Sequence, residues 1–211
     1  MKRLLFCFVT LMAVLMVEFP ASASVTTEIE SGMNYTINRP VVHTGSTQAD
    51  ASIEADIERY IRQFQKDFSV GEFINGKIEY QVMYEDTQSL SILLSDYRFS
   101  GGAHGNRTYY GLNYDKSTGT RLPLPYFVRL RPDDQGWICR LTVYDANNNE
   151  LKWEELSSNR YHQPISDNYY MLGNGELALI YQPYELAAYA YGVTHIKLTR
   201  EWIDFFNRKN R

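Results

Sequence analysis

The chain has 211 residues, with 21 Lys and Arg against 25 Asp and Glu, and a formal net charge of −4. Hydrophobic residues make up 44% and charged residues 22%, which is typical of a globular chain and excludes a disordered one. The slight acidic excess offers no basic face, so we expect no nucleic-acid partner.

The N-terminal segment predicts export. Lys2 and Arg3 precede an apolar run over residues 4–17, and the small residues 21–23 form an Ala-Ser-Ala cleavage site. The run is shorter than the roughly 20 residues that span a bilayer, and an uncleaved anchor is the alternative. We therefore expect a signal peptide over residues 1–23 and a secreted or periplasmic protein without an integral membrane span.

The clearest predicted helix spans residues 49–68. Its apolar residues recur at three- and four-residue spacing and are Ile53, Ile57, Tyr60, Ile61, Phe64 and Phe68. Charged residues fill the opposite face, so the apolar stripe must pack against another apolar surface. Extended segments at 25–30 and 33–42 precede this helix.

Alternating residues predict strands for much of the remaining chain. Residues 78–84 and 90–94 form one expected hairpin, and a further strand spans 109–114. A second hairpin, within 131–158, pairs 137–144 with 151–156, and a third pairs 169–172 with 177–181. A last strand at 193–198 precedes a short amphipathic helix capped by Thr199.

Many hairpins with few helices predict an α+β fold, built on an antiparallel sheet with one long amphipathic helix and a short C-terminal helix. No repeat or linker divides the chain after the signal peptide. We expect a single domain over 24–211, with an N-terminal part at 24–130 and a C-terminal part at 131–211.

Three stretches resemble one known family. They are YRFSGGAHGNRTYYGLNY at 97–114, NYYMLGNGELALIYQPYELAAYAYGV at 168–193, and the N-terminal extended segment followed by the long helix. Together they resemble the exported domain of the extracellular part of the anti-sigma factor RsiV and of the non-catalytic N-terminal region of the deacetylase PdaC. Its two parts are known as domains of unknown function 4163 and 3298.

The resemblance implies a non-enzymatic binding or sensing module at the cell envelope. Since such a domain in RsiV binds lysozyme, the candidate partners are a lysozyme-like protein and a cell-wall glycan, peptidoglycan. The alternatives are a cell-wall hydrolase or an accessory domain of one, and a purely structural envelope protein.

The residues themselves carry no catalytic signature. The four histidines, His43, His104, His162 and His195, lack the spacing of metal ligands, and cleavage of the signal peptide would leave Cys139 without a second cysteine. We therefore expect no catalytic residue, no metal and no cofactor. Cys139 alternates with apolar neighbours in an expected strand, which favours a buried, unreactive thiol over a nucleophile.

Two loops carry the candidate ligand-binding residues, which are His104, Asn106, Tyr184, Tyr189 and Tyr191. The glycine-rich loop 101–106 supports two interpretations: a tight connection that needs positive φ angles, or a mount that directs His104 at a ligand. The tyrosines of 184–191 either pack beneath their loop or form an aromatic surface for a glycan or a protein.

Overall fold

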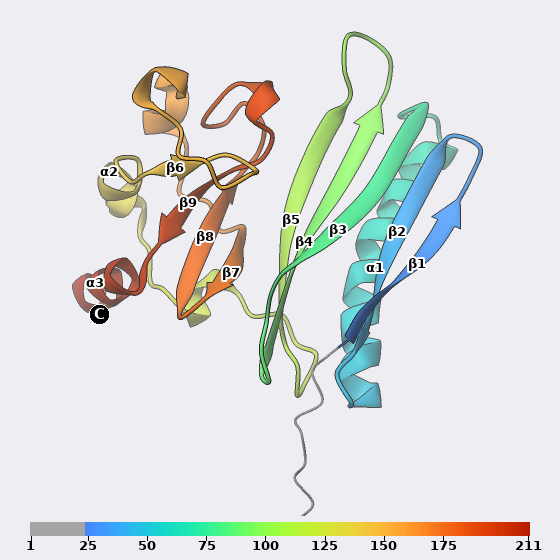
Figure 1. Ribbon diagram of the computed structural model, residues 1–211, viewed down its shortest axis with the longest axis horizontal. Coiled ribbons are helices and arrows are strands. Elements are labelled where there is room, and N and C mark those ends of the chain that lie inside the picture. The colour runs from blue at the N-terminus through green and yellow to red at the C-terminus, as the bar shows by residue number, and fades with distance from the viewer. Residues whose placement is uncertain (1–23) are drawn as a thin grey trace, which may run out of the picture.

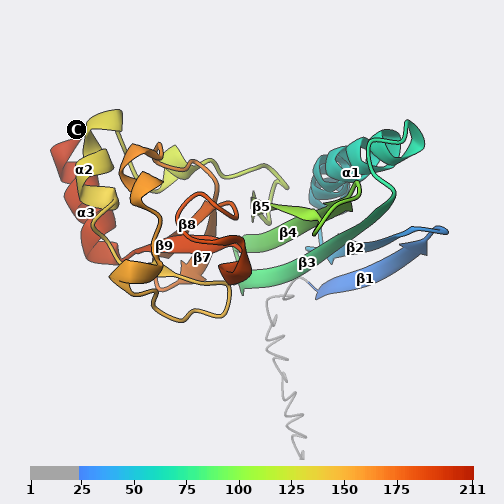
Figure 2. The ribbon, with the colours of Figure 1, turned by 90° about the horizontal axis from the view of Figure 1, so that it is seen from above.

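The computed structural model describes residues 24–211, so the predicted signal peptide lies outside the described part of the chain. Two β-sheets pack against each other, and we call them sheet A and sheet B. The long helix α1 and the short helices α2 and α3 lie at opposite ends of the molecule (Figure 2). The predicted α+β class is confirmed, including the long helix and the short C-terminal one.

Sheet A contains five strands in the order β1-β2-β3-β4-β5 (Figure 1). They are β1 (Ser24–Ser31), β2 (Tyr35–His43), β3 (Asn75–Glu85), β4 (Ser89–Phe99) and β5 (Asn106–Asp115). All neighbours are antiparallel except β2 and β3, which pair in parallel. This parallel pair departs from the purely antiparallel prediction, because α1 (Thr47–Ser69) connects the two strands and returns the chain to its starting end.

Helix α1 covers one face of sheet A. Its first turn is capped by Ser46, whose side chain accepts a hydrogen bond from the Ala49 backbone N–H at 3.3 Å. The predicted stripe is the buried face, with Ile57, Ile61 and Phe64 among its fully enclosed residues. This face packs on alternate sheet residues, which include Ile37, Ile78, Leu90, Ile92, Leu94 and Leu112.

Sheet B packs on the other face of sheet A. Its strands are β6 (Val143–Tyr144), β7 (Tyr169–Gly173), β8 (Glu176–Tyr181) and β9 (Thr194–Leu198), in the order β6-β9-β8-β7 and antiparallel throughout. Ala178 and Ile180 of β8 meet Leu93 of sheet A, whereas Leu177 and Leu179 face an outer core. Alternation along β8 therefore divides its side chains between two cores.

The outer core of sheet B is closed by α2 (Gln135–Ile138) and α3 (Arg200–Lys209). Ile203 and Phe206 of α3 are buried there, as the amphipathic pattern predicts. Thr199 occupies the N-cap position of α3, but within residues 24–211 its buried hydroxyl has no hydrogen-bond partner and makes no capping bond. The predicted cap is therefore wrong in its chemistry and right in its position.

The predicted hairpin within 131–158 is wrong. This segment contains the 3-10 helices η2 (Pro132–Asp134) and η3 (Trp153–Glu155), helix α2, and only the two-residue strand β6. The buried Asp134 carboxylate bonds Lys209 Nζ at 2.7 Å and Asn210 Nδ2 at 2.6 Å, which ties the start of the segment to the end of α3 rather than to a strand.

Two parts of that prediction survive. The chain does reverse at Asp145–Asn149, where the Asp145 carboxylate accepts backbone N–H bonds, and Leu151 then bonds the Val143 carbonyl at 2.9 Å. Cys139 ends α2 and lies in no strand, but it is buried, as expected.

Candidate functional site

Three of the predicted ligand residues meet at one end of the molecule. His104 lies in the loop between β4 and β5, and Tyr184 and Tyr189 lie in the loop between β8 and β9. The His104 ring stacks on the Tyr189 ring with centroids 4.3 Å apart, and the Tyr184 ring lies 5.4 Å from Tyr189. We call these three residues the aromatic cluster.

Hydrogen bonds order the three rings of the aromatic cluster. His104 Nδ1 lies 2.9 Å from the Gly105 carbonyl oxygen, which can only accept, so Nδ1 carries a proton. His104 Nε2 lies 3.2 Å from the Tyr184 hydroxyl, so a hydrogen bond joins these two side chains. Tyr189 donates to the same Gly105 carbonyl at 2.7 Å, so one backbone oxygen orders two rings.

The backbone of both loops is specialised. Gly101 and Gly102 have φ angles of 103° and 101°, which confirms that this turn needs glycine. Tyr184 has a φ of 73°, an uncommon conformation for a bulky residue, and its side chain is 57% exposed. Such strain costs roughly 1–3 kcal/mol and concentrates at functional positions.

Side-chain amides anchor the segment before β7 and the loop after β8 to the outer edge of β5. Gln182 pairs with the Tyr109 backbone through both amide atoms, each at 2.8 Å. Asn168 accepts from the Gly111 N–H at 2.7 Å and donates to the Tyr109 carbonyl at 2.8 Å. The two amides thus bond backbone groups of β5 that a further strand would otherwise pair with. Gln182 also holds the chain in place two residues before Tyr184.

The other two predicted ligand residues stand outside the aromatic cluster. Asn106 is exposed at the start of β5, opposite Arg98, and within residues 24–211 its side chain makes no hydrogen bond. Tyr191 is half-buried against the outer core of sheet B and donates to Glu155 Oε1 at 3.0 Å, which raises the pKa of its hydroxyl. Tyr191 therefore links the loop between β8 and β9 to η3.

A second aromatic group lies on the segment that the hairpin prediction misassigned. Trp153 and Tyr161 are 66% and 42% exposed, and the guanidinium of the buried Arg160 packs against both rings. Its central carbon is 3.4 Å from the Trp153 ring centroid and 4.6 Å from that of Tyr161, and Nη2 donates to the Tyr161 hydroxyl at 2.7 Å. We call these residues the Trp153 stack.

The Trp153 stack is fastened to the loop that carries Tyr184 and Tyr189. Besides the Glu155–Tyr191 bond, the Ser157 N–H donates to the Leu186 carbonyl at 2.8 Å, and Leu156 forms a β-bridge with Ala187. Figure 1 shows the orange segment of the stack and both loops of the aromatic cluster at the upper end of the molecule. The exposed rings thus belong to one end of the fold.

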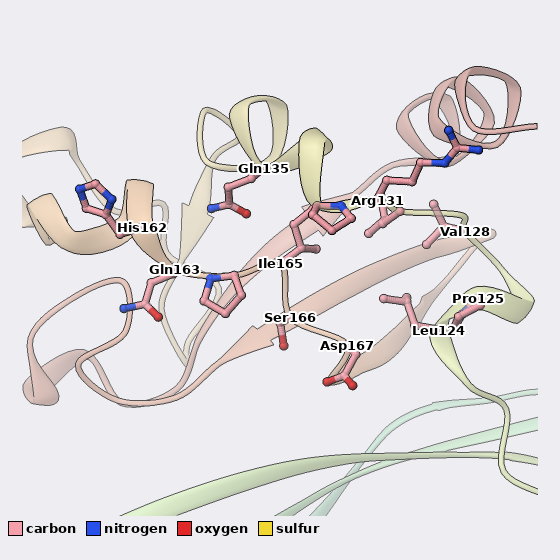
Figure 3. Close-up of a pocket in the computed structure, with 13 residues that line it drawn as sticks. Leu124, Pro125, Val128, Arg131, Gln135, His162, Gln163, Ile165, Ser166 and Asp167 are labelled. Carbon is pink, nitrogen blue, oxygen red and sulfur yellow. The ribbon is translucent and has the colours of Figure 1, made fainter.

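A cavity of about 420 Å³ opens in the irregular chain beside sheet B (Figure 3). It lies between the chain around η1 (Leu124–Tyr126), η2 and α2 on one side and the segment before β7 on the other. Its walls are mostly apolar, and the lining residues are Leu124, Pro125, Val128, Leu130, Arg131, Pro132, Gln135, His162, Gln163, Pro164, Ile165, Ser166 and Asp167.

The Trp153 stack and the cavity were not predicted from the sequence. Their residues come from irregular chain, where no period brings side chains to a common face. The available signals were weak: a tryptophan in an otherwise polar run, and prolines at 125, 132 and 164 that interrupt regular structure. Neither signal predicts which distant segments meet.

Residues 24–211 contain neither a metal-binding cluster nor a membrane-spanning helix. Within 24–211, no three His, Cys, Asp or Glu side chains are grouped so that they could hold a metal ion. Across the same range, no helix has the length and apolar character needed to cross a membrane.

Two family models match separate parts of the chain. The model described as deacetylase PdaC matches residues 27–107, from β1 to the start of β5. The model described as a protein of unknown function, DUF3298, matches residues 141–201, which contain all of sheet B. The two matches therefore follow the division into sheets A and B.

One curated relative is the peptidoglycan-N-acetylmuramic acid deacetylase PdaC of Bacillus subtilis strain 168. It is 22% identical over 199 residues, and the match covers 84% of this chain and 42% of the relative. The chain thus spans less than half of that protein's length. No anti-sigma factor is among the relatives named here, so the resemblance to RsiV stays a prediction.

Two crystal structures of DUF3298 proteins share the fold. The one from Bacteroides fragilis NCTC 9343 has a TM-score of 0.59 at 17% identity, over 88% of this chain and 93% of that one. The one from Pseudomonas aeruginosa PAO1 has a TM-score of 0.53 at 17% identity, over 86% and 91%. The chain therefore resembles the N-terminal region of PdaC in sequence and the DUF3298 proteins in fold.

Proposed function

We propose that this protein is a non-enzymatic module of the cell envelope that binds cell-wall glycan through the rings exposed at one end of its two sheets. The observation that carries the proposal is the Tyr184 ring. It is mostly exposed, held at a positive φ and hydrogen-bonded to His104. A side chain kept in a costly conformation at the surface is better explained by recognition than by packing.

The chemistry of the rings suits a sugar polymer. The face of an aromatic ring carries partial negative charge, which attracts the C–H groups of a pyranose, and the tyrosine hydroxyls can bond sugar hydroxyls. The rings are also pre-ordered, since His104 stacks on Tyr189 and Arg160 supports Trp153 from beneath. Less side-chain entropy is then lost on binding.

Two groups of rings favour a chain of sugars over a single one. The aromatic cluster and the Trp153 stack are held together by the Glu155–Tyr191 and Ser157–Leu186 hydrogen bonds. A linear glycan could contact one group with one sugar and the other group with a later sugar. Linked contacts of this kind raise affinity without a deep pocket.

The named relative supports the choice of polymer. PdaC is named for an activity on peptidoglycan, and this chain matches less than half of it. In the proposal, the matched region contributes wall contact, and the chemistry of the relative belongs to the rest of that protein. This chain would then act outside the cytoplasmic membrane, in agreement with the predicted signal peptide.

The test compares two ring variants with a matched control. Tyr184→Ala and Trp153→Ala each remove one exposed ring, and Tyr126→Ala removes a ring that is 70% exposed on η1, outside both aromatic groups. We expect each of the first two to weaken co-sedimentation with purified peptidoglycan by about tenfold or more, the loss typical of a binding hot spot. Tyr126→Ala should change it less than about twofold.

Two outcomes would contradict the proposal. One is binding to lysozyme in a pull-down with no retention on peptidoglycan, which would favour a protein partner. The other is release of acetate or sugar fragments from the wall polymer by the purified chain, with or without divalent metal, which would make it an enzyme.

A further inference from the structure

A second pocket, of about 460 Å³, lies beside α3 and has mostly polar walls. Residues 125–129 form one side of it, and residues 204–211 form the other. Because Arg129, Arg208 and Arg211 all line it, we call it the arginine pocket. We propose that the arginine pocket binds the phosphate group of a small soluble ester.

Two segments far apart in the chain bring the arginines together. Asp204, Asn207 and Arg208 are three and four residues apart, so they share one face of α3. Arg211 follows the C-cap of that helix and lines the same pocket. Arg129 comes from the segment after η1, 78 positions before Asn207. The helical period therefore explains the place of Arg208 but not that of Arg129.

Side-chain amides of α3 and its C-cap hold Arg129 at the pocket. Asn207 Oδ1 accepts from the Arg129 backbone N–H at 2.8 Å, and Asn207 Nδ2 donates to the Phe127 carbonyl at 2.8 Å. The buried Asn210 donates to the Arg129 carbonyl at 2.7 Å. Both backbone polar groups of Arg129 are thus satisfied, and the position of this residue is set before a ligand arrives, which lowers the entropy lost on binding.

The positive charge of the arginine pocket is not neutralised. All three arginines are exposed, and within residues 24–211 none of their guanidinium groups forms a salt bridge or a hydrogen bond. The negative groups at hand are the Asp204 carboxylate and the main-chain carboxylate of Arg211, and neither forms a salt bridge in that range.

The helix dipole accounts for part of this charge. A positive side chain at a helix C-terminus complements the dipole, which suits Arg208 in the last turn of α3. The dipole gives no reason for Arg129, on a separate segment, to be held at the same place. Like charges repel each other, so an anion between the guanidinium groups would stabilise the arrangement.

A phosphate ester fits this arrangement better than a carboxylate does. A guanidinium group bonds two oxygens through a planar fork, and a phosphate ester offers three terminal oxygens and a charge near −2 at about pH 8. It can therefore bond more than one arginine at once, whereas a carboxylate has two oxygens and a single charge. The inference stands apart from the proposed function, because the arginine pocket shares no residue with the aromatic cluster or the Trp153 stack.

Two soluble probes of similar size test the inference. Glycerol 3-phosphate carries a phosphate ester, and glycerate carries a carboxylate on a comparable body. At about pH 8 and a constant ionic strength of about 0.1 M, we expect glycerol 3-phosphate to bind the chain with a Kd on the order of 1 mM in a chemical-shift titration. Glycerate should bind at least about fivefold more weakly.

Four single variants assign the binding to named charges. Arg129→Gln and Arg208→Gln each remove one exposed guanidinium and should each weaken glycerol 3-phosphate about fivefold. Asp204→Asn removes the acid that competes for the arginines and should tighten binding about threefold. Lys66→Gln is the matched control, since this exposed residue ends α1 at the opposite end of the molecule from α3 (Figure 2).

The control and a membrane probe separate the possible outcomes. Lys66→Gln should change the Kd by less than about 1.5-fold, and a loss equal to that of Arg129→Gln would overturn the inference, because the binding would then follow net charge. Equal affinities for the two probes would also overturn it. So would binding to phosphatidylglycerol vesicles without binding to glycerol 3-phosphate, since the surface would then recognise a membrane.

Discussion

Sheet A and sheet B hold their backbones in different ways. The strands of sheet A have 8 to 11 residues, and those of sheet B have 2 to 6. Long strands satisfy their backbone groups by pairing with neighbours. Carboxylates close turns in both sheets, as Asp86 does between β3 and β4 and Asp145 does after β6, so the sheets differ in how much of their backbone is paired between strands.

Sheet A serves as the scaffold, and the segments around sheet B carry most of the candidate recognition residues. Tyr184, Tyr189, the Trp153 stack and the cavity all belong to irregular chain around sheet B, and only His104 comes from a loop of sheet A. Irregular segments can place side chains where no periodic element would, provided that a rigid sheet supports them. Sheet A provides that support through the bonds of Asn168 and Gln182 to β5.

The largest expected effect tests whether the two sheets unfold together. Phe64 of α1 is fully buried in sheet A's core, so Phe64→Ala should lower the free energy of unfolding by about 3–5 kcal/mol. All three tryptophans, at 137, 153 and 202, lie on the sheet B side, so their fluorescence reports on that side alone. We expect fluorescence and far-UV circular dichroism to shift together in denaturant, because Leu93 and Ile180 join the sheets.

Val70→Ala is the matched control for that comparison. Val70 is 66% exposed at the end of α1, and its truncation should change stability by less than about 0.5 kcal/mol. A Phe64→Ala protein whose circular dichroism transition moves while its tryptophan transition stays in place would show two independent folding units.

A smaller effect is expected at the contact between the sheets. Asn168→Ala removes two hydrogen bonds to the β5 backbone and exposes that edge, so we expect a loss of about 2 kcal/mol. Asn159→Ala, at an exposed position on η4 (Ser158–His162), should leave the free energy of unfolding almost unchanged. Chemical denaturation of both proteins measures the difference, and equal stabilities would mean that the amide bridge contributes nothing.

Acid should destabilise sheet B through His195. Burial between Tyr144 and Tyr170 lowers the pKa of this imidazole to about 4 in the folded protein, from an ordinary value of 6.5. Between these values the unfolded chain binds the proton more strongly, so stability falls as pH falls through this window. From pH 7 to pH 5 the loss from this group is about 2 kcal/mol.

His195→Phe separates the contribution of His195 to acid destabilisation from that of the carboxylates, which also titrate in acid. The replacement keeps an aromatic ring between Tyr144 and Tyr170 and removes the titrating group. Its unfolding free energy, measured in denaturant at both pH values, should fall by about 2 kcal/mol less than that of the unmodified chain. Parallel pH profiles for the two proteins would contradict the assignment.

The sequence predicts the structure around sheet A better than the structure around sheet B. Ile53, Ile57, Ile61 and Phe64 repeat with the helical period, and this repeat fixed both the existence and the buried face of α1. The segment 131–158 also contains alternating apolar residues, but its order comes from Asp134 and the end of α3. A bond between residues about 75 positions apart leaves no local pattern to detect.

The candidate site was partly predictable for a related reason. The two family-like motifs pointed to His104, Tyr184 and Tyr189, and the fold brings these three together. Tyr191 lies in the same motif, yet it turns to Glu155 because the 3-10 helix η5 (Tyr189–Tyr191) separates its direction from that of Tyr189. The motif therefore identified the loop, but the backbone conformation determines where each of its side chains points.

Apart from the control variants, the smallest expected change in stability is at Tyr184, and it distinguishes recognition from packing. Tyr184→Gly removes the ring but accepts the positive φ without strain, so relief of strain offsets the lost contacts and the greater freedom of the unfolded chain. We expect the free energy of unfolding to change by less than about 1 kcal/mol, while retention on peptidoglycan falls about tenfold. Tyr189→Ala is the comparison, since that half-buried ring carries both the His104 stack and the bond to Gly105, and its loss should reduce stability as well as binding. A Tyr184→Gly protein that loses more than about 2 kcal/mol and binds the wall polymer normally would make Tyr184 a structural residue and leave the proposed surface without its central ring.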